Sequence, residues 1–259
     1  MKQSTQSNHG YQSSESRQSQ MIFGTRAVIE AVQAGKDVDK ILMRSDLQSD
    51  LSRELFRIVK GTNIPLQRVP QEKLDRLTRK NHQGVIAFIS AVTYRKLEDI
   101  VPSLYEEGKT PLIVLLDGVT DVRNFGAIAR TCECAGVDAL VIPVHNSVSV
   151  NADAVKTSAG ALLTLPVCKE ASITEAVRFL KNCGYKVIAA TEKAKNTYTT
   201  ADYTVPVALV LGGEDKGISM DNLRICDEPV KIPVVGTIAS LNVSAAAAVL
   251  LYEVVRQRT

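Results

Sequence analysis

Two uninterrupted apolar runs in the C-terminal half of the chain constrain its fold more than any other feature. They are Leu112–Leu116 and Val207–Leu211, and neither contains a polar side chain. Such runs are typical of strands buried on both faces of a parallel sheet, because crossover helices cover both faces. Helical patterns and further apolar runs alternate between them, so the chain from Pro111 onward predicts an α/β fold with a Rossmann-like parallel sheet. The other expected elements are helix Asn124–Ala135, strand Ala139–Ile142, helix Ala152–Ser158, strand Leu163–Val167, helix Ile173–Asn182, strand Lys186–Ala190 and a terminal helix.

A smaller alternating series precedes this sheet and predicts a separate α/β domain over residues 21–97. Its expected helices and strands are Thr25–Ala34, Lys40–Met43, Leu51–Lys60, Ile64–Val69, Glu72–Thr78 and Val85–Val92. Pro102 and Gly108 then interrupt the pattern, so residues 98–110 are predicted to be a linker. The second domain is accordingly expected over residues 111–259.

Composition excludes several classes of protein. Residues 1–20 are rich in Ser and Gln and nearly devoid of apolar side chains, so they are predicted to form a disordered tail. There is no signal-peptide core and no apolar run near the roughly 20 residues of a membrane helix, which favours a cytoplasmic protein that does not enter a membrane. The five cysteines are odd in number and lie in apolar segments, as expected of reduced, mostly buried thiols. No cysteine spacing suits a zinc site, and we expect no metal.

Charge is unevenly distributed along the chain. Residues 22–97 hold 14 Lys and Arg against 8 Asp and Glu, whereas residues 98–259 hold 15 against 19. A basic module joined to a slightly acidic one indicates a polyanionic partner, although a solvated charged surface explains the counts equally well. The densest basic cluster lies between residues 73 and 80. We expect Arg79 and Lys80 in this cluster to contact RNA phosphates; the alternative is a solvated helix face.

The first of three candidate site segments is LDGVTDVRNFGAIARTCECAG, residues 116–136. A strand ends, a polar turn follows, and a helix opens near Asn124, which would sit at the helix start as a cap. Arg130 lies in an otherwise small and apolar helix. An arginine is costly to bury there unless an anion pairs with it, and its guanidinium can hold a phosphate or a carboxylate with two hydrogen bonds.

The second segment is VALVLGGEDKGIS, residues 207–219. Gly212 and Gly213 follow a buried strand, so the backbone can approach a ligand closely at the carboxyl edge of the sheet. The segment matches neither a P-loop nor a dinucleotide-binding fingerprint, which disfavours a nucleotide-dependent oxidoreductase. Glu214 could accept hydrogen bonds at this edge, or could be an ordinary turn carboxylate.

The third segment is the C-terminal stretch KIPVVGTIASLNVSAAAAVLLYEVVRQRT, residues 231–259. An apolar, strand-like run ends at Val235, Gly236 permits a sharp turn, and a polar elbow leads into a helix of small and apolar residues. Ser240 or Asn242 is expected to cap that helix. Its four consecutive alanines would let another backbone or subunit approach closely. Taken alone, the pattern also suits an ordinary buried terminal helix.

Together, in this order and spacing, the three segments resemble the motifs of the SpoU (TrmH) family of RNA 2′-O-ribose methyltransferases in the SPOUT superfamily. The resemblance covers essentially all of residues 22–259. The stretches IFGTRAVIEAV and NHQGVIAF are similar to the ribosomal-protein L30e-like substrate-binding domain of the 23S rRNA guanosine-2′-O-methyltransferases in that family. The shorter tRNA ribose methyltransferases of the family typically lack that domain.

The resemblance implies a site assembled from these segments. Its catalytic residues would be Asn124, Arg130, Glu214, Ser240 and Asn242. Its residues for binding S-adenosylmethionine would be Thr191, Gly212, Gly213, Ile232 and Leu241. The resemblance also implies that the C-terminal segment forms a deep trefoil knot, and that the protein is a homodimer with active sites at the subunit interface.

The reaction that the resemblance implies is methyl transfer to a ribose 2′-hydroxyl of RNA, with a guanosine of 23S rRNA as the expected substrate. A ribose hydroxyl is a poor acid, so loss of its proton must be assisted at neutral pH. Because arginine has a pKa above about 12, Arg130 and a nearby RNA phosphate are expected to share this task. Methylation of tRNA, and a non-catalytic role in RNA binding or ribosome assembly, remain open as alternatives.

Overall fold

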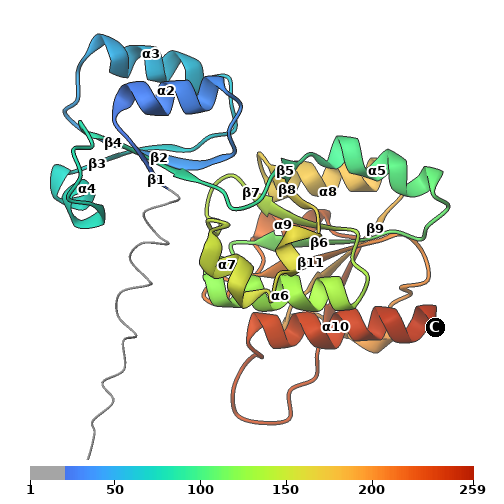
Figure 1. The fold of residues 1–259 in the computed structure, drawn as a ribbon. Coiled ribbons are helices and arrows are strands. Elements are labelled where there is room, and N and C mark those ends of the chain that lie inside the picture. The colour runs from blue at the N-terminus through green and yellow to red at the C-terminus, as the bar shows by residue number, and fades with distance from the viewer. Residues whose placement is uncertain (1–20) are drawn as a thin grey trace, which may run out of the picture. The chain divides into compact units, whose positions relative to one another are not determined.

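The computed structural model describes residues 21–259 and divides the chain into two compact units, Met1–Ala91 and Val92–Thr259 (Figure 1). The first unit is described from Met21 onward, so the predicted disordered tail lies outside the described residues. Each unit has its own sheet and its own buried core.

The first unit is built on a four-stranded sheet with the strand order β1-β4-β2-β3. Its strands are β1 (Met21–Phe23), β2 (Val38–Arg44), β3 (Leu66–Val69) and β4 (Val85–Ile89). Strands β2 and β3 are parallel, and the other neighbours are antiparallel. The helices of this unit are α2 (Thr25–Gln33), α3 (Asp50–Val59) and α4 (Gln71–Leu77). The predicted alternating series is therefore present, with element ends shifted by a few residues.

Side-chain alternation along the strands gives this sheet two unlike faces. Ile41 and Val85 belong to the face that packs with α2 and α3, and both are fully buried. Leu42 and Ile86 belong to the opposite face, where Leu74 of α4 packs against them. Because α4 is a short helix, aromatic residues at the margin of this second cluster are only partly buried.

The second unit contains an eight-stranded sheet with the order β10-β12-β9-β11-β6-β7-β8-β5, in which every neighbouring pair is parallel. Its strands are β5 (Tyr94–Arg95), β6 (Leu112–Asp117), β7 (Ala139–Pro143), β8 (Val167–Glu170), β9 (Lys186–Ala190), β10 (Asn196–Thr197), β11 (Val207–Gly212) and β12 (Glu228–Lys231). The predicted α/β class with a parallel sheet is confirmed. The two apolar runs that predicted it form β6 and β11, which are neighbours in the middle of the sheet.

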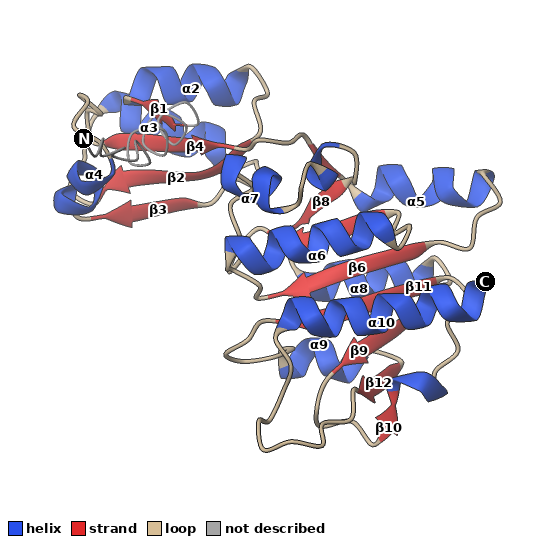
Figure 2. Ribbon diagram, turned by 60° about the horizontal axis from the view of Figure 1, so that its bottom comes forward, coloured by secondary structure: helices blue, strands red, loops and turns tan. Residues whose placement is uncertain are grey.

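Helices cover both faces of this sheet (Figure 2). Those on one face are α6 (Val122–Cys134), α7 (Ala152–Thr157) and α10 (Val243–Arg258). Those on the other face are α5 (Leu97–Glu106), α8 (Ile173–Asn182) and α9 (Met220–Ile225). Val114 of β6 is buried in the first layer and Ile113 in the second, which explains why the run has no polar residue. None of the helices formed by residues 21–259 is long and apolar enough to cross a membrane.

The segment predicted as a linker, residues 98–110, instead contains most of helix α5. Leu97, Val101 and Leu104 recur at helical spacing and are buried. Burial of these side chains outweighs the disruption expected from Pro102, which lies inside the helix and cannot donate a backbone hydrogen bond. Tertiary packing therefore overrides the local signal that predicted a break.

Two predicted strand boundaries in the second unit are also wrong. The strand expected over Leu163–Val167 begins only at Val167, because residues 161–163 form a short 3-10 helix. The apolar run expected to extend to Val235 leaves the sheet at Lys231, and the side chain of Val235 is 99% exposed. Residues 232–242 are therefore a loop and not a continuation of the strand.

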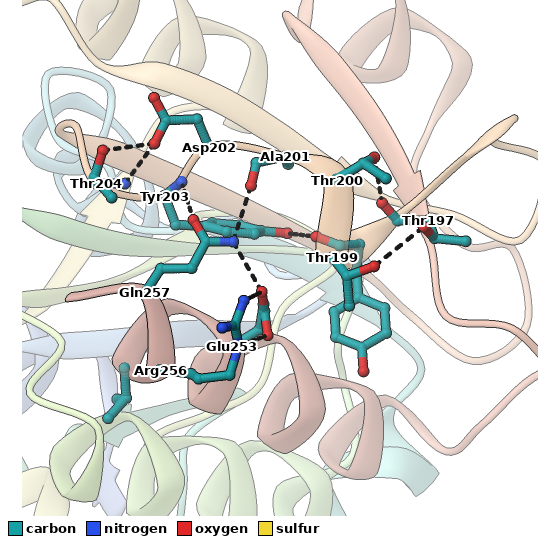
Figure 3. Close-up of polar contacts among 12 residues, drawn as sticks. Thr197, Thr199, Thr200, Ala201, Asp202, Tyr203, Thr204, Glu253, Arg256 and Gln257 are labelled. Atoms are coloured by element: carbon teal, nitrogen blue, oxygen red, sulfur yellow. Dashed lines mark hydrogen bonds and ion pairs between the residues drawn. The ribbon is translucent and has the colours of Figure 1, made fainter. Parts of the chain in front are cut away.

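A polar network holds the C-terminal end of α10 against the segment that precedes β11 (Figure 3). The side chain of Gln257 accepts a hydrogen bond from the N–H of Tyr203 and donates one to the carbonyl of Ala201, each at 3.0 Å. Gln257 also donates to Glu253, a buried carboxylate that accepts two hydrogen bonds from Arg256. The hydrogen bond from Arg256 lowers the pKa of Glu253, so this carboxylate stays charged although its side chain is buried.

Candidate active site

The candidate site lies at the carboxyl ends of β6 and β11, where Asp117 is paired with Gly212. Two loops follow these strands, residues 118–121 and 213–219, and a third loop, residues 232–242, leads into α10. Ligands commonly bind in the crevice at this edge of a parallel α/β sheet. The three segments singled out in the sequence therefore meet at one place in the fold.

Gly212 and Gly213 are required by the packing of the loop that follows them. A Cβ atom on Gly212 would lie 2.2 Å from backbone atoms of Gly217 and Ile218, and one on Gly213 would lie 2.3 Å from the carbonyl oxygen of Gly118. The loop folds back on itself, since the N–H of Gly217 donates to the carbonyl of Gly213 at 2.9 Å. The sequence predicted that the backbone at these glycines could approach a ligand closely. In the structure the two glycines approach other backbone segments of the chain.

Asn124, Glu214 and Asn242 form a hydrogen-bonded group that we term the amide–carboxylate cluster. The Nδ2 atom of Asn124 donates to Oε1 of Glu214 at 3.0 Å, and Nδ2 of Asn242 donates to Oδ1 of Asn124 at 3.0 Å. Asn242 also donates to the same oxygen of Glu214. Three of the residues that the resemblance placed in the active site are thus in direct contact, although each comes from a different segment.

Helix capping separates the roles of the two asparagines. Asp121 is the N-cap of α6, because its carboxylate accepts from the N–H groups of Arg123 and Asn124 at 2.8 and 2.9 Å. The predicted capping role of Asn124 is therefore wrong, and its side-chain amide bonds within the cluster instead. Asn242 is the N-cap of α10, since its Oδ1 accepts from the N–H of Ser244 at 2.9 Å. Of the two predicted caps for that helix, Asn242 is correct.

A cavity of about 300 Å³ lies beside the cluster, between the ends of β9, β11 and β12 and the loop that leads to α10. It is lined by parts of residues 190–193, 211–218 and 230–246. Apolar side chains such as Val230 and Ile232 lie in its wall together with polar groups. The predicted site residues that line this cavity are Thr191, Gly212, Gly213, Glu214, Ile232, Ser240 and Leu241.

A second and more polar cavity, of about 520 Å³, shares the loop 213–217 with the first. Asn124 and Glu214 lie in its wall, together with Asp117 and residues 118–121. Asp117 is a functional candidate that the sequence reasoning missed. Its Oδ2 accepts from the N–H of Ser219 and from the side chain of Asn222, each at 2.8 Å, so it holds the far end of this loop. The sequence feature that could have identified Asp117 is a carboxylate directly after an apolar strand.

Arg130 is the predicted catalytic residue that the single chain does not bring to the site. It is exposed on α6 and lines neither cavity. Arg130 is six positions after Asn124 on the helix, so it lies about 9 Å further along the axis and on a different face. Within residues 21–259 its guanidinium forms no hydrogen bond or ion pair, so the buried anion that the sequence suggested is not needed.

The predicted RNA-contacting residues lie in the first unit, just after α4. Arg79 and Lys80 are both exposed. The neighbouring His82 is buried and is structural: its Nδ1 accepts from the N–H of Gly84 at 3.1 Å, so Nε2 carries the proton and donates to Asp75 at 2.9 Å. This histidine fixes the loop that presents the two basic side chains.

The five cysteines differ in how deeply they are buried. All five are free, but only Cys132 and Cys168 are fully buried, and Cys134 is exposed, so the prediction of mostly buried thiols is only partly correct. Burial raises the pKa of Cys168 to about 12 and that of Cys226 to about 11, and it raises that of Cys132 further. These thiols therefore stay protonated at neutral pH. The part of the chain from Met21 onward contains no group of three or more His, Cys, Asp and Glu side chains that could hold a metal ion.

Two protein families match the chain, one in each half. The family described as SpoU rRNA Methylase matches residues 111–252, which is more than half of the chain. The family described as RNA 2′-O ribose methyltransferase substrate binding matches residues 21–95. YacO of Bacillus subtilis (strain 168), a protein placed in the TrmH family of tRNA/rRNA methyltransferases, is 32% identical over 243 residues, which cover 94% of this chain and 98% of YacO.

Solved structures show the same fold. AviRb from Streptomyces viridochromogenes, a SpoU methyltransferase in complex with the cofactor AdoMet, aligns with a TM-score of 0.60 at 25% identity, over 95% of this chain and 98% of AviRb. The A. aeolicus TrmH/SpoU tRNA modifying enzyme aligns with a TM-score of 0.53 at 32% identity. That alignment covers 62% of this chain and 84% of the tRNA modifying enzyme.

Proposed function

Because the chain belongs to the SpoU family of RNA methyltransferases, we propose that it transfers a methyl group from S-adenosylmethionine to a ribose 2′-hydroxyl of RNA. The single observation that carries the proposal is the amide–carboxylate cluster beside the cavity at the carboxyl edge of the sheet. Asn124, Glu214 and Asn242 meet there from segments up to 118 residues apart. A protein that used the fold only to bind RNA would have no need of this arrangement.

The first cavity suits S-adenosylmethionine, the cofactor bound in the AviRb structure. Val230, Ile232 and Leu241 provide apolar surface for an adenine ring, and Thr191, next to Val230, provides a polar group. The loop 212–217 lines the cavity, and its three glycines leave their backbone groups uncovered by side chains of their own. When bound, the cofactor supplies an electrophilic methyl group attached to a sulfonium sulfur.

The ribose oxygen forms the new C–O bond, and its proton must leave, because an uncharged hydroxyl is a weak nucleophile. We assign Glu214 and the two asparagines to positioning. Both amides donate to Oε1 of Glu214, and no hydrogen bond from residues 21–259 reaches its Oε2, which is free to accept from the ribose. Holding the two reactants in line contributes much of the rate in such a transfer.

We propose that Arg130 acts across a homodimer interface, together with an RNA phosphate that takes the proton. Its exposure on α6 and its absence from both cavities of its own chain support this, because a second subunit would bring it to a neighbouring site. The helices α6 and α10 pack side by side, and Ala245 of α10 is exposed at their surface. Sedimentation of the purified chain as a dimer is expected, and a monomer that retains full activity would contradict the assignment.

For the substrate we propose a guanosine of 23S rRNA, as in enzymes of the RlmB type, with tRNA as the second candidate. Residues 21–95, which match a substrate-binding domain, support the first choice. AviRb aligns over 95% of this chain, whereas the A. aeolicus tRNA modifying enzyme aligns over 62% of it. We further propose that the RNA-binding domain, expected over 21–97, is the first unit, which ends at Ala91, and that the catalytic domain, expected over 111–259, is the second unit, Val92–Thr259. The trefoil knot and the cytoplasmic location stay predictions.

The decisive experiment supplies methyl-labelled S-adenosylmethionine and compares 23S rRNA with tRNA, both prepared from a strain that lacks the gene. Nucleoside mass spectrometry is expected to find 2′-O-methylguanosine in the 23S rRNA. Asn124→Ala is expected to abolish the product, while Asn182→Ala, an exposed asparagine on α8, leaves it unchanged. Product in tRNA alone would establish the second candidate, and absence of product from both RNAs would refute the proposed function.

A further inference from the structure

The sheet of the first unit has an aromatic and basic face that takes no part in the candidate active site. Phe23 of β1 and Phe88 of β4 are both partly exposed and pack at the margin of the small cluster under α4. In the strand register Phe88 is paired with Met21 on one side and with Lys40 on the other. The two phenylalanines are therefore diagonal neighbours on adjacent strands, about 7 Å apart.

Each of these rings has a lysine ammonium over its face. The Nζ atom of Lys40 lies 4.9 Å from the ring centroid of Phe88, and that of Lys80 lies 5.5 Å from the centroid of Phe23. Both distances are within the range of cation–π attraction. Neither ammonium forms an ion pair with a carboxylate in the described part of the chain. The face thus combines two partly exposed rings with two positive charges that form no ion pair.

A buried histidine anchors the loop that presents Lys80. His82 is buried beneath it and joins Asp75 of α4 to the backbone N–H of Gly84 through the two hydrogen bonds described above. The contact occupies the carboxylate of Asp75, the acidic group of α4 nearest this loop in the sequence. Lys80 is therefore available to an external anion.

We propose that Phe23, Lys40, Lys80 and Phe88, the aromatic–basic face, bind a single-stranded segment of the RNA substrate by stacking bases on the two rings. This inference rests on the proposed function in taking RNA as the substrate. Aromatic rings that are partly exposed on a sheet can stack unpaired bases, whereas paired bases in a duplex are not accessible to them. When bases take their place over the rings, the two positively charged lysines move to the negatively charged phosphates of the RNA.

A second aromatic–cation pair in the same unit serves as the matched control. Phe56 of α3 is 36% exposed, and the guanidinium of Arg68 lies 5.0 Å from its ring centroid. Helix α3 packs on the opposite face of the sheet from α4, Phe23 and Phe88. The pair is a single ring on a helix and has no second ring at the spacing of a neighbouring base, so the proposal assigns it no RNA.

The chain has no tryptophan, so a single introduced one reports on its own surroundings. The full-length variants Phe88→Trp and Phe56→Trp are titrated, without cofactor, with a 12-nucleotide single-stranded RNA and with a duplex of the same length. Single-stranded RNA is expected to quench the emission of the first variant and to leave that of the second unchanged. The duplex is expected to quench neither.

Binding of the single strand is then compared among leucine variants that keep apolar volume in place. Phe23→Leu and Phe88→Leu are each expected to weaken binding by about tenfold, since stacking on an aromatic ring stabilises a bound base, and Phe56→Leu is expected to have no effect. Lys40→Ala and Lys80→Ala should each reduce the slope of log affinity against log salt by about 0.7. Circular dichroism establishes that each variant is folded.

Equal quenching at both tryptophans, or unchanged affinity in Phe23→Leu and Phe88→Leu, would overturn the proposal. So would a change in self-association of these two variants on sedimentation, because the face would then contact a second copy of the chain. Failure of the chain to methylate any RNA would refute the proposed function and leave these binding results standing. If variants that have lost the stacking signal still methylate RNA normally, catalysis does not require this face. That result would overturn this inference and leave the proposed function standing.

Discussion

Replacement of Gly212 by alanine tests whether close backbone packing shapes the candidate site. The added Cβ would lie 2.2 Å from the carbonyl carbon of Gly217 and the nitrogen of Ile218, and real Cβ contacts essentially never fall below 3.0 Å. The loop 213–217 must therefore move by at least about 0.8 Å. The backbone of Gly212 is not in the left-handed region, so the expected effect comes from the contact alone and not from a strained φ angle.

Overpacking of this kind costs about 1–3 kcal/mol. For a unit the size of Val92–Thr259 this lowers the melting temperature by about 2–12 °C. The same loop lines both cavities, so we also expect the affinity for S-adenosylmethionine to fall by about tenfold or more. Thermal unfolding followed by circular dichroism and isothermal titration calorimetry with the cofactor measure the two effects.

Gly236 provides the matched control in the loop before α10. A Cβ atom there meets nothing within 4 Å, and the backbone has no positive φ, so Gly236→Ala is expected to change neither quantity. The sequence alone had suggested that Gly236 permits a sharp turn. The reasoning is refuted if Gly212→Ala binds the cofactor like the wild type, or if Gly236→Ala is equally damaging.

Three further predictions concern the cluster, the exposed arginine and the far end of α10. Asn242→Ala removes the cap of α10, so we expect a loss of about 1 kcal/mol in chemical denaturation together with loss of single-turnover methyl transfer; unchanged turnover would exclude Asn242 from the site. Arg130→Ala should leave the cofactor dissociation constant unchanged, because Arg130 lines neither cavity, and should lower turnover with saturating RNA by about 100-fold; near-wild-type turnover would remove it from the mechanism. The hydrogen bond from Arg256 lowers the folded-state pKa of Glu253. The stabilisation that the ionised carboxylate provides is therefore complete above the ordinary pKa of about 4.5, and it is lost as the pH falls through the lowered pKa. Glu253→Gln should therefore flatten the fall in stability with acid below about pH 4.5, and parallel acid profiles for the two proteins would contradict this.

The fold class of the second unit was accessible from the sequence, since burial on both faces of a strand leaves a local record. Leu112–Leu116 and Val207–Leu211 contain no polar residue, and these runs became the paired strands β6 and β11. The resemblance to known motifs identified the residues of the site, and three of them are in contact. Residue patterns alone had left each of these residues with an ordinary structural alternative.

What the sequence by itself determined were features that depend on neighbours along the chain: the apolar runs, most helices and the two candidate caps of α10, Ser240 and Asn242. Only the tertiary structure decided which strands became neighbours, and hence that Asn124, Glu214 and Asn242 share hydrogen bonds across 28 to 118 residues. It also decided that Asp121 and not Asn124 caps α6, because the two side chains compete for the same few N–H groups. Helix α5 forms despite Pro102, because burial of its apolar side chains outweighs the break that a proline predicts from local sequence alone.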